Sequence, residues 1–203
     1  MRLPRPTPES LRGRVPLLAA SYAVMTRTSE DEGVEVLLQL RQGTGFMDGW
    51  WACGAAGHIE DAGSPVEALH REVEEELGVR VLAAAPLTTV QRSTLAGPRE
   101  QRADFFFHVT QWSGEPTLRE PDKAAELRWW PLAQLPERVV PHERLVLEGL
   151  RDGGCPPSSR WVTTSGSSSS PRWEPTAPSG STAACRGTSP RTSSTSRRSR
   201  WVA

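Results

Sequence analysis

The segment that most restricts the fold of this 203-residue chain is residues 65–77, which predicts one α-helix bounded at both ends. Ser64 is a residue type that caps a helix start, Pro65 fits the first helical position, and Glu67 completes a capping box. Gly78 then supplies a helix stop, because glycine adopts the left-handed backbone conformation at no steric cost. The sequence therefore predicts a helix over residues 65–77 that must bury one face against another element.

The faces of this predicted helix differ in chemistry. At 100° per residue, the apolar side that we expect to pack against a sheet consists of Val66, Leu69, Val73 and Leu77. An adjacent arc of roughly 100° carries Glu72, Glu75 and Glu76. Three carboxylates on neighbouring turns repel one another, which raises their pKa values and weakens the helix unless a cation binds them. Hard divalent cations take carboxylate oxygens, so the cluster predicts a Mg²⁺ or Mn²⁺ site, in which Arg71 can hold one carboxylate. The alternative is an acidic surface helix without a ligand, because glutamate is also a good helix former.

Apolar patterns outside this helix predict a mixed sheet. In residues 34–41, Val36, Leu38 and Leu40 share one face, as expected for a half-buried strand that forms a hairpin with residues 17–26. Further strands are expected at residues 79–92, 102–112 and 127–130, and a second helix at 142–151. Strands of this kind with two separated helices predict an α/β sandwich.

Composition divides the chain into three parts. We expect an N-terminal arm at residues 1–13, one domain at 14–154, and a low-complexity, disordered tail at 155–203, which is rich in Ser, Thr, Pro and Arg. Such a tail cannot bury enough apolar surface to offset its ordering entropy. Its origin is open between a natural low-complexity segment and an out-of-frame translation of GC-rich DNA. Charge is balanced over the whole chain, but the part up to Arg151 is acidic by about five charges and the remainder is basic by the same amount.

The same composition limits the location and partners of the protein. No secretory signal is recognisable at the start, and no apolar run is long enough to cross a bilayer. Cys53, Cys155 and Cys185 are odd in number and widely spaced, which favours a reducing cytoplasm over a disulfide framework. The basic residues are too sparse to predict nucleic acid as a partner, so an interaction protein with a nucleic-acid-binding tail has the least support.

Residues 57–79, GHIEDAGSPVEALHREVEEELGV, resemble the signature of the Nudix hydrolases, G-x5-E-x7-R-E-U-x-E-E-x-G-U, where U is a bulky aliphatic residue. Eight of the nine fixed positions match, namely Gly57, Arg71, Glu72, Val73, Glu75, Glu76, Gly78 and Val79. The resemblance, which is to the MutT-like members, implies a Nudix-type α/β/α sandwich over about residues 14–151. It also implies hydrolysis of a nucleoside diphosphate linked to another group, with Mg²⁺ or Mn²⁺ bound by Glu72, Glu75 and Glu76 and by the carbonyl of Ala56.

One position departs from the signature. The first glutamate of the family pattern falls on Gly63, which has no side chain to bind a metal or orient water. Losing a residue that supports a metal site lowers activity on the order of 10- to 100-fold, although Glu60 and Asp61 lie in the same loop and could compensate. The alternative to a phosphoanhydride hydrolase is therefore a nucleotide-binding or sensing module with little or no hydrolysis.

Catalytic roles are expected for Glu75, Glu76, Arg71 and Glu120. Either Glu75 or Glu76 is expected to orient the attacking water in addition to binding metal. Glu120 is the best candidate for an additional acid beyond the signature, with Asp122 and Glu126 behind it. A solvated loop acid is an equally good interpretation of each of these three residues.

A small nucleotide is the expected substrate, and the loop of residues 41–51 carries the candidates for binding it. Arg41, Phe46 and Trp50 are assigned to substrate binding, since aromatic rings can stack on a base. At least one of Trp50 and Trp51 is expected in the core instead. His58 is a further substrate-binding candidate and His108 a weaker one, although an isolated histidine is more often structural.

Overall fold

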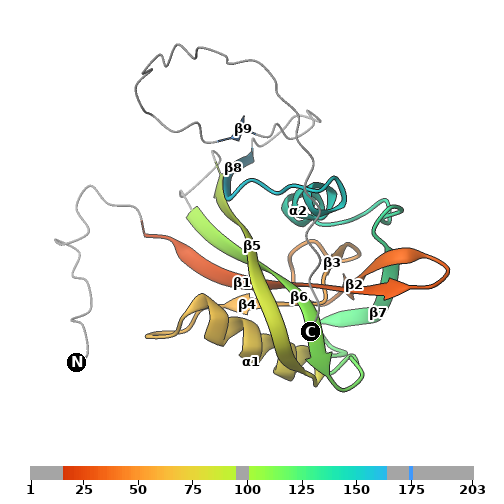
Figure 1. Ribbon diagram of the computed structural model, residues 1–203. Helices are drawn as coiled ribbons and strands as arrows, with labels where there is room; N and C mark the ends of the chain where they lie inside the picture. The colour runs from red at the N-terminus through yellow and green to blue at the C-terminus, as the bar shows by residue number, and fades with distance from the viewer. Residues whose placement is uncertain (1–15, 95–100, 164–173, 176–203) are drawn as a thin grey trace, which may run out of the picture.

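The computed structural model describes residues 16–94, 101–163 and 174–175 (Figure 1). In chain order the elements are β1 (Leu18–Ser29), β2 (Gly33–Arg41), β3 (Trp51–Cys53), β4 (Ala55–His58), α1 (Pro65–Leu77), β5 (Arg80–Thr94), β6 (Gln101–Ser113), β7 (Ala124–Pro131), α2 (Pro141–Arg151), β8 (Ser158–Thr163) and β9 (Glu174–Pro175). The two predicted helices and all the predicted strands are present, with bounds that differ by a few residues.

The described strands form one mixed sheet in the order β3-β2-β1-β6-β5-β8-β9, with β4 paired to β1 and β7 to β2. β1 runs parallel to β6, and β5 runs parallel to β8. The other pairs are antiparallel, including the hairpin between β1 and β2 that the sequence predicts.

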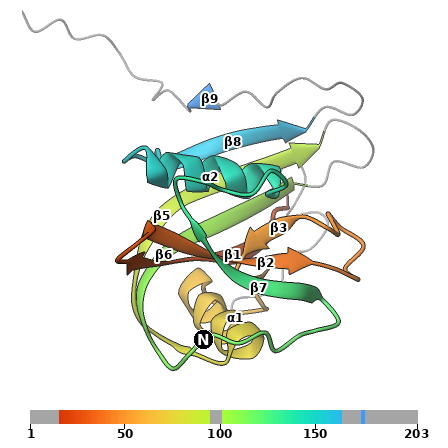
Figure 2. The same cartoon turned by 90° about the vertical axis from the view of Figure 1, so that its right-hand side faces the viewer.

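The two helices cover opposite faces of this sheet, as Figure 2 shows, so the fold is the expected α/β/α sandwich. Alternation along β1 divides the core in two: Tyr22 and Val24 lie with Val146 and Leu147 of α2. The neighbouring residues of β1 face the other way, and this second cluster contains Ala23, Met25, Leu69, Val73 and Leu77. The strand period of two residues thus places one apolar set under each helix.

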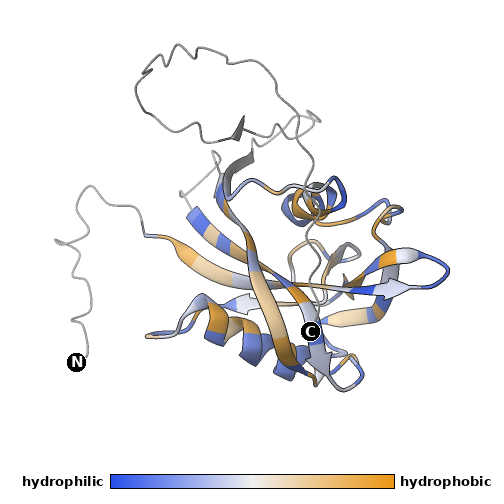
Figure 3. Ribbon diagram, in the orientation of Figure 1, coloured by the Kyte–Doolittle hydropathy of each residue, from blue (hydrophilic) through white to orange (hydrophobic). Residues whose placement is uncertain are grey.

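Helix α1 begins and ends as its sequence predicts. The Ser64 hydroxyl accepts a hydrogen bond from the backbone N–H of Glu67, and the Glu67 carboxylate accepts one from the backbone N–H of Ser64 at 2.8 Å. Gly78 ends the helix with φ 70°, and its N–H donates to the carbonyl of Glu74. α1 carries both hydrophilic and hydrophobic residues along its length (Figure 3).

The expected burial of Val66 is wrong: 49% of this residue remains exposed, whereas Ala68 is buried at 4%. Val66 has the same angular position as the buried residues further along the helix, but it lies in the first turn. Burial depends on what lies opposite a side chain, and angle alone does not determine it. The other three apolar residues of the predicted face, Leu69, Val73 and Leu77, are fully buried.

Structure continues beyond the expected end of the domain. Residues 158–163 form β8, which pairs in parallel with residues 89–94 of β5, and the Thr88 hydroxyl donates to the carbonyl of Pro156 at 2.6 Å. Residues 158–163, which the sequence analysis placed in the tail, thus form a strand in the structure. Backbone hydrogen bonds to an open sheet edge do not require apolar side chains, so composition did not reveal this strand. The arm of residues 1–13 and the remaining tail, apart from β9, lie outside the described residues.

Aromatic side chains occupy the core more than the surface. Phe106 faces the α2 side while Phe107 faces the α1 side, as the alternation in β6 predicts. Trp51 is buried and meets Trp130 edge to face, with ring centroids 5.2 Å apart.

Among the described helices, neither is long and apolar enough to cross a membrane.

Candidate functional site

A pocket of about 460 Å³ lies where α1 crosses β4 and the end of β2. The signature helix, the strand before it and the segment that leads into β7 all contribute side chains. Its lining residues are Gln39, Arg41, Thr44, Ala56, Gly57, His58, Glu60, Arg71, Glu72, Glu75, Glu76, Glu120 and Lys123. The fold therefore gathers most of the predicted site residues around one hollow, together with Gln39, Thr44 and Lys123, to which the sequence analysis assigned no role.

Glu76 lies deepest among the carboxylates of this pocket. Its Oε2 accepts hydrogen bonds from the side-chain amide of Gln39 at 3.1 Å and from the backbone N–H of Ala56 at 3.3 Å. Burial, followed by the nearby charge of Glu72, raises the pKa of Glu76 to about 7. The carboxylate is thus held in place but disfavoured as an anion, which is the condition that a bound cation would relieve.

Glu72 lies against the backbone of β4. A Cβ atom added to Gly57 would lie 1.8 Å from Glu72 Oε1, so a larger residue at this position would require the carboxylate to move. Burial raises the pKa of Glu72, and the adjacent charge of Arg71 opposes the rise.

Arg71 joins the helix to the loop that precedes it. Its Nη2 lies 2.7 Å from Glu72 Oε1 and donates to the carbonyl of His58 at 2.8 Å. Its Nη1 donates to Glu75 Oε2 at 3.1 Å. The expected contact of Arg71 with a carboxylate is therefore present, and the arginine holds two of them.

The loop that leads into β7 brings Glu120 to the same pocket. Lys123 forms an ion pair with Glu120 Oε1 at 2.8 Å. Asp122 and Glu126 do not line the pocket, and Glu126 on β7 faces Arg128 at 3.9 Å instead. Of the three acids considered beyond the signature, only Glu120 is placed where it can act.

The donor set suits a hard divalent cation, because its side-chain oxygens come from carboxylates and its buried member carries a raised pKa. Within the described residues, however, no three acidic, histidine or cysteine side chains stand close enough together to hold a metal as they are arranged. Glu72 and Glu75 are both turned toward Arg71.

A second, smaller pocket of about 140 Å³ adjoins the first and shares with it Arg41, Ala56, Gly57 and His58. It is lined by residues of β1, β4, β5 and β6 and of the start of α2. Its remaining lining residues are Ala20, Tyr22, Phe46, Arg92, Arg102, His142 and Glu143. At its mouth, the guanidinium of Arg41 lies 5.6 Å from the centroid of the Phe46 ring.

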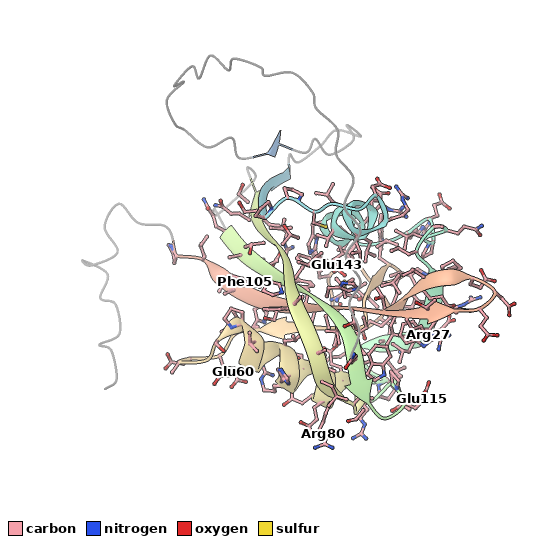
Figure 4. All side chains as sticks on the ribbon, viewed as in Figure 1. Arg27, Glu60, Arg80, Phe105, Glu115 and Glu143 are labelled. Carbon is pink, nitrogen blue, oxygen red and sulfur yellow. The ribbon has the colours of Figure 1, made fainter. Side chains whose placement is uncertain are left out.

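Polar groups form the inner end of this second pocket. His142 is buried, and its Nε2 has no hydrogen-bond partner among the described residues. Beside it, Glu143 Oε2 accepts a hydrogen bond from the backbone N–H of Cys53 at 2.5 Å, and burial raises the pKa of Glu143 to about 7. Arg92 pairs with the buried Asp104 and donates to the Tyr22 hydroxyl at 3.2 Å. Figure 4 shows Glu143 near α2 and Glu60 at the opposite side of the sheet, beside α1.

Sequence reasoning found some of these residues and missed others. Trp50, predicted to bind substrate, lines neither pocket, and His108 hydrogen-bonds Thr26 Oγ1 at 2.7 Å away from both. His142 and Glu143 were missed because they look like the polar first turn of an ordinary helix. Gln39 was missed because polar residues on an alternating strand are expected to face solvent.

Known proteins share this architecture and its signature. The family profile described as NUDIX domain matches residues 17–150. An 8-oxo-dGTP diphosphatase of Proteus vulgaris is 33% identical over 90 residues, which cover 44% of this chain and 77% of that protein. A MutT NUDIX hydrolase of Burkholderia pseudomallei superimposes with a TM-score of 0.58 at 28% identity, covering 66% of this chain and 98% of its own. The NUDIX domain of Shewanella oneidensis NrtR, solved with ADP ribose, gives a TM-score of 0.56 at 20% identity over 70% and 90% of the two chains, which is a likeness of fold alone.

Fold and site together define a hydrolase of the pyrophosphohydrolase class. The chain belongs to the Nudix family and is a MutT-like member of it. Nudix hydrolases generally use divalent metal ions and act on phosphoanhydrides of nucleotides. The predictions of the family, the fold and the enzyme class are therefore confirmed.

Proposed function

We propose that this protein is a metal-dependent hydrolase of nucleoside triphosphates, with an oxidised purine nucleotide such as 8-oxo-dGTP as the first substrate to test. The observation that carries the proposal is the junction of two pockets, one acidic and one small, that share Arg41, Ala56, Gly57 and His58. A nucleotide has the same two parts, a phosphate chain that binds with cations and a planar base. The name of the Proteus vulgaris relative supports this choice of substrate.

The acidic pocket is the proposed site of Mg²⁺ or Mn²⁺. Glu72, Glu75, Glu76 and the carbonyl of Ala56 would hold the ions, and Glu120 lies close enough to the same hollow to assist. Such ions neutralise phosphate oxygens and lower the pKa of bound water. The chain's own part is positional: Gln39 and Ala56 hold Glu76, and Arg71 holds Glu72 and Glu75. Either Glu75 or Glu76 is proposed to orient the attacking water.

The smaller pocket is the proposed site of the base. Phe46 offers a face for stacking, and the Nε2 of His142, which has no hydrogen-bond partner among the described residues, offers a polar group for a base edge. Arg41 and His58 line both pockets and are proposed to contact the part of the nucleotide between base and phosphates. Trp50 is left out of this site because it lines neither pocket.

A nucleotide-sensing module is the second candidate, and Gly63 favours it. The acid that most family members carry there is absent, so a domain that binds a nucleotide and turns it over poorly would keep the same fold. The retained Glu72, Glu75 and Glu76 favour an enzyme.

A substrate panel with purified protein distinguishes the two candidates. dGTP, 8-oxo-dGTP, ADP-ribose, NADH and diadenosine polyphosphates would each be incubated with Mg²⁺ or Mn²⁺, and inorganic pyrophosphate, phosphate and nucleotide products would be separated. We expect a nucleoside triphosphate to be turned over fastest. Absence of turnover across the panel, with nucleotide binding measured by calorimetry, would support the sensing module instead.

A cytoplasmic location is proposed as well. Both cysteines among the described residues, Cys53 and Cys155, are free thiols, which is usual in a reducing compartment.

A further inference from the structure

The missing acid at position 63 leaves a hollow beside the signature helix. A pocket of about 390 Å³ is lined by Glu60, Asp61, Ala62, Gly63, Ser64, Glu67, Ala68 and Arg71. A Cβ atom on Gly63 would meet nothing closer than the carbonyl oxygen of Glu60 at 3.3 Å. The loop therefore has room for a side chain at position 63, and Arg71 lines the same hollow.

Arg71 is already bound along one side of its guanidinium group. Nη1 and Nη2 contact Glu75, Glu72 and the carbonyl of His58. Nε shares an edge of the guanidinium with Nη2, and its acidic neighbour in the loop is Glu60, whose Oε1 lies 3.7 Å away. Because 31% of the arginine side chain is exposed, water competes for Nε wherever no acid holds it.

The loop backbone fixes the place of Glu60. The N–H of Gly63 donates to the carbonyl of Glu60 at 2.9 Å, which closes a tight turn over residues 60–63. Within this turn Ala62 has φ 68°, a left-handed conformation that costs a non-glycine residue about 1 kcal/mol. The turn keeps Glu60 at the side of Arg71 although the Glu60 side chain itself is 72% exposed.

We propose that Glu60 is a positioning residue, which holds Arg71 from the loop side and so compensates for the carboxylate missing at position 63. Its effect on metal binding passes through Arg71 to Glu72 and Glu75, and in this respect it rests on the proposed function. An arginine held on both sides keeps these two carboxylates at the edge of the acidic pocket. Without Glu60, the arginine keeps the His58 carbonyl as a contact on the loop side and is freer to swing out with them.

Four proteins test this inference: the wild type, Glu60→Gln, Gly63→Glu and the double variant. Mn²⁺ binding would be measured by electron paramagnetic resonance of the free ion. We expect Glu60→Gln to weaken Mn²⁺ binding about two- to fivefold, as befits an exposed ion pair, and Gly63→Glu to bind Mn²⁺ at least as well as the wild type. In the Gly63→Glu background, Glu60→Gln should change the affinity by less than about 1.5-fold, because the new acid takes over Arg71. Equal losses in both backgrounds would overturn the proposal.

Two further measurements are needed. One distinguishes the effect of Glu60 from that of removing any negative charge, and the other tests the Glu60–Arg71 pairing without relying on the proposed function. Glu74→Gln, an exposed change on the same helix, is the matched control and should leave Mn²⁺ binding unchanged. Hydrogen exchange of the Arg71 Nε–H, followed by NMR without metal, should speed up in Glu60→Gln and recover in Glu60→Asp. Unchanged exchange would overturn the proposal whether or not Mn²⁺ binds. Failure of the wild type to bind Mn²⁺, with faster exchange in Glu60→Gln, would instead refute the proposed metal site and leave the Glu60–Arg71 pairing standing.

Discussion

The backbone of Gly57 lies directly against the carboxylate of Glu72, so that a methyl group at position 57 would overlap it at 1.8 Å. The two residues belong to successive elements of the chain, Gly57 to β4 and Glu72 to α1. Both residues line the acidic pocket, so their contact lies at the site itself.

Gly57→Ala should therefore displace Glu72 and weaken Mn²⁺ binding and turnover by about tenfold or more, the size seen when groups that support a metal site are lost. Gly154→Ala is the matched control, because no atom lies within 4 Å of a Cβ placed there. Kinetics and Mn²⁺ titration on both variants check this. Full activity in Gly57→Ala would mean that Glu72 can move without loss.

The position of Glu76 predicts a difference between neighbouring glutamates. Glu76→Gln should lower kcat by at least about 100-fold, because the buried carboxylate is a proposed ligand, whereas Glu74→Gln should change kcat less than about twofold. Glu75→Gln should resemble Glu76→Gln, since Glu75 also lines the acidic pocket. Steady-state kinetics at saturating Mg²⁺ measure this. Equal losses at positions 74 and 76 would contradict the assignment of helix faces.

The raised pKa of Glu76 predicts how stability depends on pH in the metal-free protein. The pKa of about 7 lies above the ordinary 4.5, so between these two pH values Glu76 keeps its proton in the folded state and has lost it in the unfolded state. Stability should thus fall as pH rises from about 4.5 to about 7, by on the order of 1–3 kcal/mol from this group. Glu143 titrates in the same range.

Thermal melts from pH 5 to pH 8 without metal would show a smaller fall in Glu76→Gln than in the wild type. Glu143→Gln, measured in parallel, shows how much of the fall in stability comes from the second buried acid. Added Mg²⁺ should raise the melting temperature more at pH 8 than at pH 5, because protons compete with the metal for the carboxylate. Parallel melting curves for the wild type and Glu76→Gln would show that Glu76 is not the group that titrates.

The second pocket predicts a change in substrate affinity. Phe46→Ala should raise KM for a nucleoside triphosphate about tenfold with a smaller effect on kcat, because stacking of a base on an aromatic ring is lost. Trp50 lines neither pocket, so Trp50→Ala serves as the control, and we expect its KM to be almost unchanged. If Trp50→Ala raised KM more than Phe46→Ala, the base would have to bind at another part of the loop.

Deletions at the C-terminal end should separate β8 from the residues that follow. Removing residues 156–203 uncovers the edge of β5 and takes away the hydrogen bond from Thr88 to Pro156, so the melting temperature should fall by several degrees. Removing residues 164–203 keeps β8, and we expect melting temperature and turnover to stay near those of the full chain. Identical melts for both deletions would show that β8 adds nothing to stability.

Local sequence determined the parts of this protein whose causes are local. The limits of α1, from the Ser64 cap to Gly78, follow from side-chain hydrogen bonds and backbone preferences within a few residues. The signature spacing likewise placed Glu72, Glu75, Glu76 and Arg71 on one side of that helix, where the structure has them line one pocket.

Only the tertiary structure decided what faces each of these residues. It exposed Val66, brought His142 and Glu143 of α2 to a pocket next to Arg41, and set Glu60 beside Arg71. It also added β8 to the sheet through backbone pairing, where composition predicted disorder. Such contacts join segments distant along the chain, and their energies depend on packing and burial, which the period of a helix or strand does not encode.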